Sequence, residues 1–113
     1  MYKLFGIPNC DTVKKARTFL EKKKVEFEFI DFKKSPPASV DIKRWEEKFG
    51  GLPVNSKGQT YKKHKDTYEK LTAGQKVKFL TENSSMIKRP ILEKNGKVLA
   101  FGFEEDSYKT LLV

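Results

Sequence analysis

The sequence predicts an α/β fold in which a strand–helix–strand unit is followed by a helical insert, an antiparallel hairpin and a final helix. Three observations predict this order. An apolar run at residues 2–7 gives way to a helical pattern, residues 25–32 alternate between apolar and acidic side chains, and Asn95–Gly96 separates two apolar runs. A chain of 113 residues is long enough for one core and too short for two independent ones. We therefore expect one domain over residues 1–113.

The first third of the chain predicts a parallel unit. Residues 2–7 form a short buried strand, Pro8–Asn9 interrupts it, and residues 12–23 follow as a helix. The helix repeats apolar side chains at the spacing of one face, namely Val13, Ala16 and Leu20. The alternation over residues 25–32 is typical of a strand with one buried face. A strand–helix–strand connection this short should be right-handed, with parallel strands.

The helical insert is expected at about residues 38–85. Residues 39–49 predict an amphipathic helix that Gly50–Gly51 ends. Its inward residues are expected to be Val40, Ile42, Trp45 and Phe49, with Trp45 as a packing anchor. Residues 52–59 have no clear period and predict a loop, and two further helices are expected at 60–69 and 72–83. We interpret His64, which lies among lysines, as a surface histidine.

The last third predicts a hairpin and a helix. Residues 90–94 and 97–101 flank Asn95–Gly96, a pair that favours the type I′ turn because both turn residues need positive φ. The two strands should therefore be antiparallel neighbours. Gly102 ends the second strand, and residues 104–112 can form a helix. Its inward side chains are expected to be Tyr108, Leu111 and Leu112.

Composition excludes several classes of function. A single cysteine allows no internal disulfide, and the chain shows no leader and no apolar run of membrane-spanning length, so we expect a cytoplasmic protein. The formal charge of +9 comes mainly from lysines spread through the chain. This distribution favours a solvated surface that attracts anions over a dedicated nucleic-acid face. One Cys and one His do not predict a metal site or any bound cofactor.

Cys10 is the main candidate for chemistry. It lies between the apolar strand and the basic helix, where free amides and the positive end of the helix dipole favour thiolate over thiol. Lys14 and Lys15 act in the same direction, and Asp11 opposes them. The alternative is a small buried cysteine, but such residues more often lie within an apolar run.

Two motifs resemble a known family. The segment from Gly6 to Ala16 is similar to the active-site segment of the ArsC family of arsenate reductases and their relatives, Spx and the YffB-type proteins, and it is nearest to the YffB type. The segment Lys88–Ile91 resembles that family's second signature, an arginine followed by a proline at the start of the third strand. The resemblance covers nearly the whole chain and implies a thioredoxin-like fold.

The resemblance also implies roles for particular residues. It makes Cys10 the nucleophile and Arg89 the group that binds anion or stabilises thiolate. Pro90 is implied to be cis and opposite the cysteine, although a trans turn and a surface arginine are the simpler alternatives. Asn9, Thr12, Pro90 and Lys57 are the expected substrate-binding residues.

The sequence departs from the family pattern at three positions that concern arsenate. The family's glutathione-linked arsenate reductases use three arginines, of which only Arg89 has a clear counterpart here. Lys57 could replace a second arginine, but lysine lacks the guanidinium fork, and Phe101 stands where the third is expected. Gly6 occupies the place of a histidine. These departures weigh against efficient arsenate reduction.

Two functional hypotheses follow from the residues and the resemblance. The first is an arsenate reductase-like thiol oxidoreductase that uses Cys10 and depends on glutathione, or on a glutaredoxin-like thiol donor, as co-substrate. The second is a regulatory protein like Spx that binds RNA polymerase without catalysis. Many Spx proteins carry a Cys-x-x-Cys pair, whose second position is Val13 here, so an internal disulfide switch is excluded. A basic nucleic-acid module, which would bind with steep salt dependence, is a third and weaker alternative.

Overall fold

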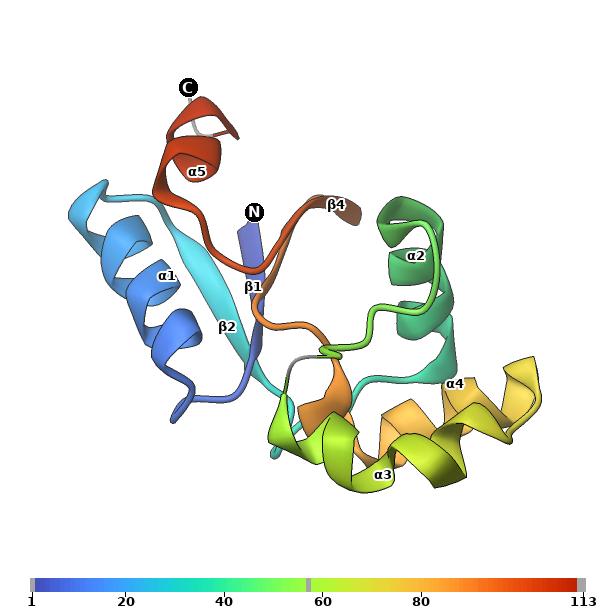
Figure 1. The fold of residues 1–113 in the computed structure, drawn as a ribbon. Helices are drawn as coiled ribbons and strands as arrows, with labels where there is room; N and C mark the ends of the chain where they lie inside the picture. Colours follow the sequence, from blue (N-terminus) through green and yellow to red (C-terminus); the bar gives the residue numbers. More distant parts are fainter. Residues whose placement is uncertain (1, 57, 112–113) are drawn as a thin grey trace. The chain divides into compact units, whose positions relative to one another are not determined.

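The computed structural model describes residues 2–56 and 58–111 (Figure 1). The chain divides into two compact units, one made of Met1–Ser35 with Arg89–Val113 and the other of Pro36–Lys88. The first unit holds the sheet and the second holds the inserted helices. Among the described residues, no helix is both long and apolar enough to cross a bilayer. The predicted α/β class is confirmed, whereas the single domain over residues 1–113 stays a prediction.

The first unit is built on a four-stranded mixed sheet. Its strands are β1 (Tyr2–Gly6), β2 (Phe27–Asp31), β3 (Ile91–Lys94) and β4 (Lys97–Phe101), in the order β2-β1-β3-β4. β1 pairs with β2 in parallel and with β3 antiparallel, and β3 and β4 are antiparallel. Both predicted pairings are therefore confirmed. The parallel pair requires a crossover, which helix α1 (Asp11–Lys22) supplies.

Helix α1 packs its apolar stripe onto one face of this sheet. The stripe consists of Val13, Ala16, Phe19 and Leu20, all buried, and includes the three residues predicted to face inward. A core cluster joins this stripe to Leu4 of β1 and Leu92 of β3. Fully burying a leucine side chain contributes about 1.5–3 kcal/mol. The cluster therefore fixes α1 against β1 and β3.

The hairpin forms as the turn residues predict. Asn95 and Gly96 have φ angles of 52° and 82°, as a type I′ turn requires. A register shift between Leu92 and Glu93 leaves Leu99 of β4 as an extra residue, which makes a bulge. Gly102, at φ 75°, then turns the chain out of β4, and its amide donates to the Pro90 carbonyl at 2.7 Å.

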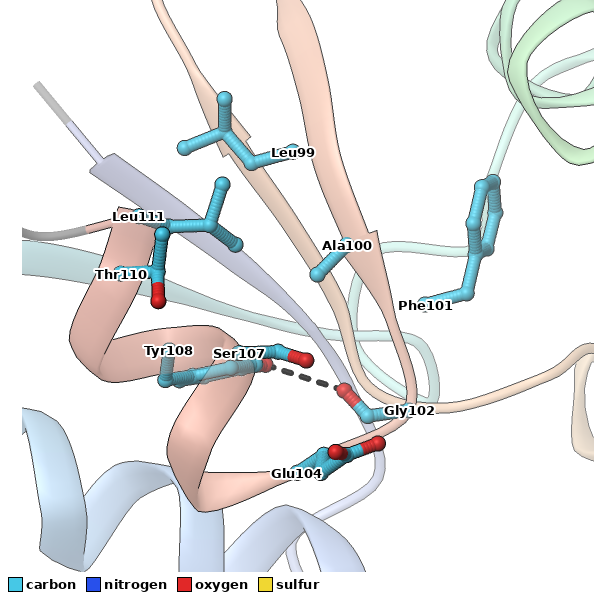
Figure 2. A pocket seen from close by; sticks show the side chains of 9 residues that line it. All are labelled: Leu99, Ala100, Phe101, Gly102, Glu104, Ser107, Tyr108, Thr110 and Leu111. Carbon is cyan, nitrogen blue, oxygen red and sulfur yellow. Dashed lines mark hydrogen bonds between the residues drawn. The ribbon is translucent and has the colours of Figure 1, made fainter.

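Helix α5 (Glu105–Leu111) is held to the end of β4 by one buried tyrosine. The Tyr108 hydroxyl donates to the Gly102 carbonyl at 3.1 Å (Figure 2). Its ring lies edge-on to Phe103 and Phe19, with centroids 4.8 Å and 6.1 Å away. Burial of Tyr108 raises its pKa above the ordinary tyrosine value. Leu111 is half-buried, and Leu112, also expected to face inward, lies outside the described residues.

The second unit consists of helices α2 (Ser39–Phe49), α3 (Gln59–Glu69) and α4 (Ala73–Glu82), followed by the 3₁₀ turn Ser84–Met86. Gly50 ends α2 in the left-handed conformation, with φ 82°, as predicted. Thr72 begins α4, because its hydroxyl accepts the Gln75 amide at 3.3 Å while the Gln75 side chain accepts the Thr72 amide at 2.9 Å.

The predicted inward face of α2 is partly wrong. Ile42 and Trp45 are fully buried, but Val40 is 68% exposed and Phe49 41% exposed. At 3.6 residues per turn, Val40 lies on nearly the opposite side of the helix from Ile42. Phe49 shares the face of Ile42 and Trp45, but it is the last residue of the helix.

Two contacts within the insert add to what the sequence predicted. Val54, in the predicted loop over residues 52–59, forms an isolated antiparallel bridge with Ile87, and Gln59 is already the first residue of α3. His64 is half-buried and not simply a surface residue, since its ring lies 5.6 Å from the ring of Phe79 on α4. Both contacts join residues that are distant in the chain.

We expect Tyr108→Phe to lower the free energy of unfolding by about 1–3 kcal/mol, because the buried Gly102 carbonyl loses its hydroxyl donor. The matched control is Tyr61→Phe, whose hydroxyl makes only an exposed 3.4 Å contact with Glu69 and whose loss should change stability by less than about 0.5 kcal/mol. Urea unfolding of both variants measures the difference. Equal losses would contradict the role given to Tyr108.

Candidate active site

The Cys10 site begins at a tight turn between β1 and α1. The Cys10 amide donates to the Ile7 carbonyl at 3.2 Å, which places Pro8 and Asn9 at the corners of the turn. The carbonyl of Gly6, at the end of β1, accepts the amide of Phe32 at 2.8 Å. The turn is therefore tied to the ends of both parallel strands. The predicted break at Pro8–Asn9 is confirmed.

Cys10 occupies the N-cap of α1. Its backbone is extended, with φ −88° and ψ 126°, and its carbonyl accepts the Lys14 amide at 2.9 Å. A side chain at the N-cap faces the amides of the second and third helical residues, which here are Thr12 and Val13. Cys10 forms no side-chain capping hydrogen bond of standard geometry. Its sulfur nevertheless lies where a negative charge interacts favourably with the helix start.

The pKa of the Cys10 thiol is lowered from its ordinary value by the balance of opposing influences. The largest single influence is desolvation of the half-buried sulfur, which raises the pKa. It is outweighed by hydrogen bonding from the Val13 amide, by the hydrogen bond and positive charge of the Arg89 side chain, and by the Thr12 amide. The local environment therefore favours the thiolate, the nucleophilic form of cysteine.

Arg89 comes to the site from the start of β3. The Arg89–Pro90 peptide bond is cis, as the resemblance implied, and Pro90 is buried. Arg89 is half-buried, and its Nε is fully buried. Because β1 and β3 are neighbouring strands, the residue before β3 can reach the turn that follows β1. The guanidinium then acts on the Cys10 sulfur.

Gly6 and Val13 are packed against each other beside the cysteine. A Cβ at position 6 would lie 2.8 Å from Cγ2 of Val13, closer than real carbon contacts allow. Val13 is fully buried. Gly6 stands where the resemblance places a histidine, and Val13 stands at the position of the second cysteine of Spx. These two residues are in contact with each other. No side chain fits at position 6 while Val13 keeps its place.

The structure brings some of the predicted site residues together and leaves others apart. Cys10, Thr12 and Arg89 meet at the start of α1. Asn9 is exposed at the corner of the adjoining turn. Lys57 lies outside the described residues. The Val13 amide was missed as a named contributor. It is the third residue of α1, which begins at Asp11, one residue before the predicted start at Thr12.

Phe101, which stands at the expected place of a third arginine, is the last residue of β4. It pairs in register with Ile91 at the start of β3. Its side chain leaves β4 on the side opposite α5, as Figure 2 shows. Phe101 supplies no positive charge, and among the described residues the charge of Arg89 acts on Cys10.

The fold combines a strand–helix–strand unit, which has a cysteine at the start of its helix, with an antiparallel hairpin that follows a cis-proline. This combination defines a thioredoxin-like protein with one candidate reactive thiol. The sequence profile of the ArsC family matches residues 5–111. The chain therefore belongs to the ArsC family.

Solved structures and relatives agree with this assignment. A YffB protein superposes with a TM-score of 0.87 and 33% identity over the whole of both chains. A Streptococcus mutans protein, described as a possible arsenate reductase, superposes with a TM-score of 0.81 and 30% identity over 100% of this chain and 98% of its own. An uncharacterised Haemophilus influenzae protein is 34% identical over 96% of each chain.

A global transcriptional regulator is also among the relatives. The Spx protein of Streptococcus agalactiae is 27% identical over 115 residues, which cover 99% of this chain and 83% of Spx. The similar proteins therefore include one described as a possible arsenate reductase and one described as a transcriptional regulator.

We expect the rate of Cys10 alkylation by iodoacetamide to reach half its maximum at a lower pH than it does for an unperturbed cysteine thiol, whose pKa is about 8.5. Because the pKa is lowered, the thiolate persists as pH falls and is lost only below this lowered value. Arg89→Ala should move the midpoint upward, and Arg89→Lys should move it less, since lysine keeps the charge. Rates measured from pH 5 to 10 test this.

The matched control for the alkylation experiment is Arg17→Ala. Arg17 is also on the first unit, with its guanidinium 4.4 Å from the centre of the Phe29 ring, and it is not among the groups that shift the Cys10 pKa. Its removal should leave the midpoint unchanged. An Arg89→Ala midpoint equal to that of the unaltered protein would contradict the assigned role of Arg89.

We expect Gly6→Ala to destabilise the protein by about 1–3 kcal/mol, because the new methyl group overlaps Val13. Val13→Ala removes the atoms that it would meet. The double variant should therefore be more stable than the sum of the single changes predicts, by about 1 kcal/mol or more. Urea unfolding of the four proteins measures this coupling, and strict additivity would rule out the contact.

Proposed function

We propose that this protein is a glutathione-dependent thiol oxidoreductase in which Cys10 is the nucleophile. The observation that carries the proposal is the lowered pKa of Cys10, caused by the Val13 and Thr12 amides and by Arg89 against the cost of desolvation. The thiolate is the form of cysteine that attacks an oxidised sulfur, and a lowered pKa increases the thiolate fraction at a given pH. Membership of the ArsC family supports the same class of reaction.

The proposed reaction is a pair of thiol–disulfide exchanges. The Cys10 thiolate attacks the glutathione sulfur of a mixed disulfide, so that a new S–S bond joins Cys10 to glutathione and the substrate leaves as a thiolate. A second glutathione thiolate then attacks the glutathione sulfur on Cys10. This step releases oxidised glutathione and restores the Cys10 thiolate. Overall, one glutathione thiolate enters and its sulfur joins the glutathione sulfur of the mixed disulfide as oxidised glutathione. The substrate leaves as a thiolate, so atoms and electrons balance.

An external thiol is required because Cys10 is the chain's one cysteine. Glutathione is an anion at neutral pH, and the chain's formal charge of +9 favours its approach. A glutaredoxin-like protein could supply the same thiol. During each exchange, the helix-start amides and Arg89 would stabilise whichever sulfur carries the negative charge, while the Thr12 hydroxyl and Asn9 would contact the substrate.

Arsenate is the less suitable substrate for this site. An oxyanion is best held by several bidentate guanidinium groups, and Arg89 is the guanidinium that acts on Cys10. The contact between Gly6 and Val13 leaves no room for a histidine before the nucleophile. We therefore propose disulfide exchange ahead of arsenate reduction, although a similar Streptococcus mutans protein is described as a possible arsenate reductase.

A regulatory role like that of Spx is the second candidate, supported by the match that spans 99% of this chain. In this role the protein would bind RNA polymerase without catalysing thiol exchange. Val13, buried at the position of a second cysteine, would make the binding independent of an internal disulfide. Binding to purified polymerase that Cys10→Ser leaves intact, together with no exchange activity, would favour this role.

We expect Cys10→Ser to reduce exchange activity by at least a hundredfold, because serine is far less nucleophilic than a thiolate at neutral pH. Activity is measured with hydroxyethyl disulfide and glutathione, with glutathione reductase reporting the oxidised glutathione formed. Ser35→Ala, which removes an exposed hydroxyl from the same unit, is the control and should retain activity. Full turnover by Cys10→Ser would remove Cys10 from the mechanism.

A further inference from the structure

A groove runs along α1 on the side that faces the segment before α5. Its volume is about 340 Å³, and all its residues belong to the first unit. We call it the α1 groove and define it by Lys14, Lys15, Lys22, Phe19, Phe103 and Glu105. It is separate from the contacts that surround the Cys10 sulfur. Its chemistry is different too, because it combines an aromatic floor with a basic rim.

The floor of the α1 groove is formed by two phenylalanine rings. The ring centres of Phe19 and Phe103 are 5.7 Å apart, and Phe103 also packs against Tyr108 at 4.8 Å. Phe19 is largely buried, whereas Phe103 is half-buried and leaves part of its ring accessible. Because Tyr108 and the core support these rings, the floor is already formed without a ligand. It can accept an apolar side chain.

The rim of the groove is charged unevenly. Lys14, Lys15 and Lys22 are all exposed on α1, and Glu105 is the acidic residue on the opposite side. Three ammonium groups against one carboxylate favour an anionic ligand. Glu105 repels anions from the α5 side, so the negative groups of a ligand would lie along α1.

The distance from Cys10 to the far end of the groove favours a peptide ligand over a small thiol. At a rise of about 1.5 Å per residue, Lys14 lies roughly 6 Å along the helix from Cys10, and Lys22 roughly 18 Å. An extended chain advances at most about 3.3–3.6 Å per residue, so a tripeptide thiol held at Cys10 covers only about 10 Å. A ligand that reaches both Cys10 and Lys22 needs about six or seven residues.

We propose that the α1 groove binds an extended acidic segment of a protein substrate while the oxidised sulfur of that segment lies at Cys10. Two acidic side chains about four residues apart would match the spacing of Lys14 and Lys22, and an apolar side chain between them would rest on Phe103. This inference deepens the proposed function, on which it rests, by naming the substrate class as an acidic polypeptide disulfide.

The test uses a heptapeptide of sequence Cys-Gly-Glu-Gly-Phe-Gly-Glu as its mixed disulfide with glutathione, and a second peptide in which glutamine replaces both glutamates. Lys22→Glu should lower kcat/KM about tenfold for the acidic peptide. It should change the value less than twofold for the glutamine peptide and for hydroxyethyl disulfide, which do not engage Lys22 by charge.

The matched control is Lys33→Glu, which changes the net charge equally at an exposed site in the same unit but outside the groove. It should affect the acidic peptide less than twofold. Equal losses from Lys22→Glu and Lys33→Glu would mean general electrostatic attraction and would overturn the proposal. A loss for hydroxyethyl disulfide as large as that for the acidic peptide would also overturn it.

A binding measurement separates this proposal from the catalytic one. Cys10→Ser protein labelled with ¹⁵N is titrated with the acidic peptide carrying serine in place of cysteine. Amide shifts centred on Lys15, Lys22 and Phe103 are expected. If these shifts occur while the unaltered protein shows no exchange activity, the groove is supported and the proposed function fails. If exchange occurs without these shifts and without preference for the acidic peptide, the function stands and the groove proposal fails.

Discussion

The end of β1 and the first turn of α1 approach each other so closely that no side chain fits between them. The contact is made by Gly6 and Val13, and a Cβ on residue 6 would lie 2.8 Å from the valine methyl carbon. The core cluster beneath α1 holds the helix in this place, and the turn closed between Ile7 and Cys10 sets where the helix begins. The position of the Cys10 sulfur follows from these constraints, because the N-cap residue faces the free amides of the helix start.

The same constraint accounts for the electrostatics of the site. Partial burial alone would favour the neutral thiol and make Cys10 a weak nucleophile. The Val13 and Thr12 amides and Arg89 overcome this cost. The packing of α1 against the sheet places the two amides. Arg89 is distant from Cys10 in the chain, but β3 lies next to β1. The antiparallel pairing of these strands therefore contributes to thiolate stability as directly as the helix does.

Two of the departures from the family pattern, Gly6 and Val13, are residues in contact with each other. A larger residue at position 6 would require a smaller one at position 13, so the two positions cannot vary independently. The site retains one guanidinium, one thiol and the amides of the helix start, which suit a sulfur substrate better than an oxyanion. The α1 groove extends this inference from the reacting sulfur of the substrate to the polypeptide segment that carries that sulfur.

The sequence by itself determined the features that depend on neighbouring residues. These include the strand–helix–strand unit, the type I′ turn at Asn95–Gly96, the end of α2 at Gly50 and the start of a helix at Cys10, because short-range backbone preferences decide them. The pairing of Cys10 with Arg89 was expected from the family resemblance and not from any local pattern. Only the tertiary structure decided the bridge between Val54 and Ile87 and the position of Phe103 beside the lysines of α1. Such contacts join residues far apart in the chain, and they arise from how helices and strands pack, which no short segment encodes.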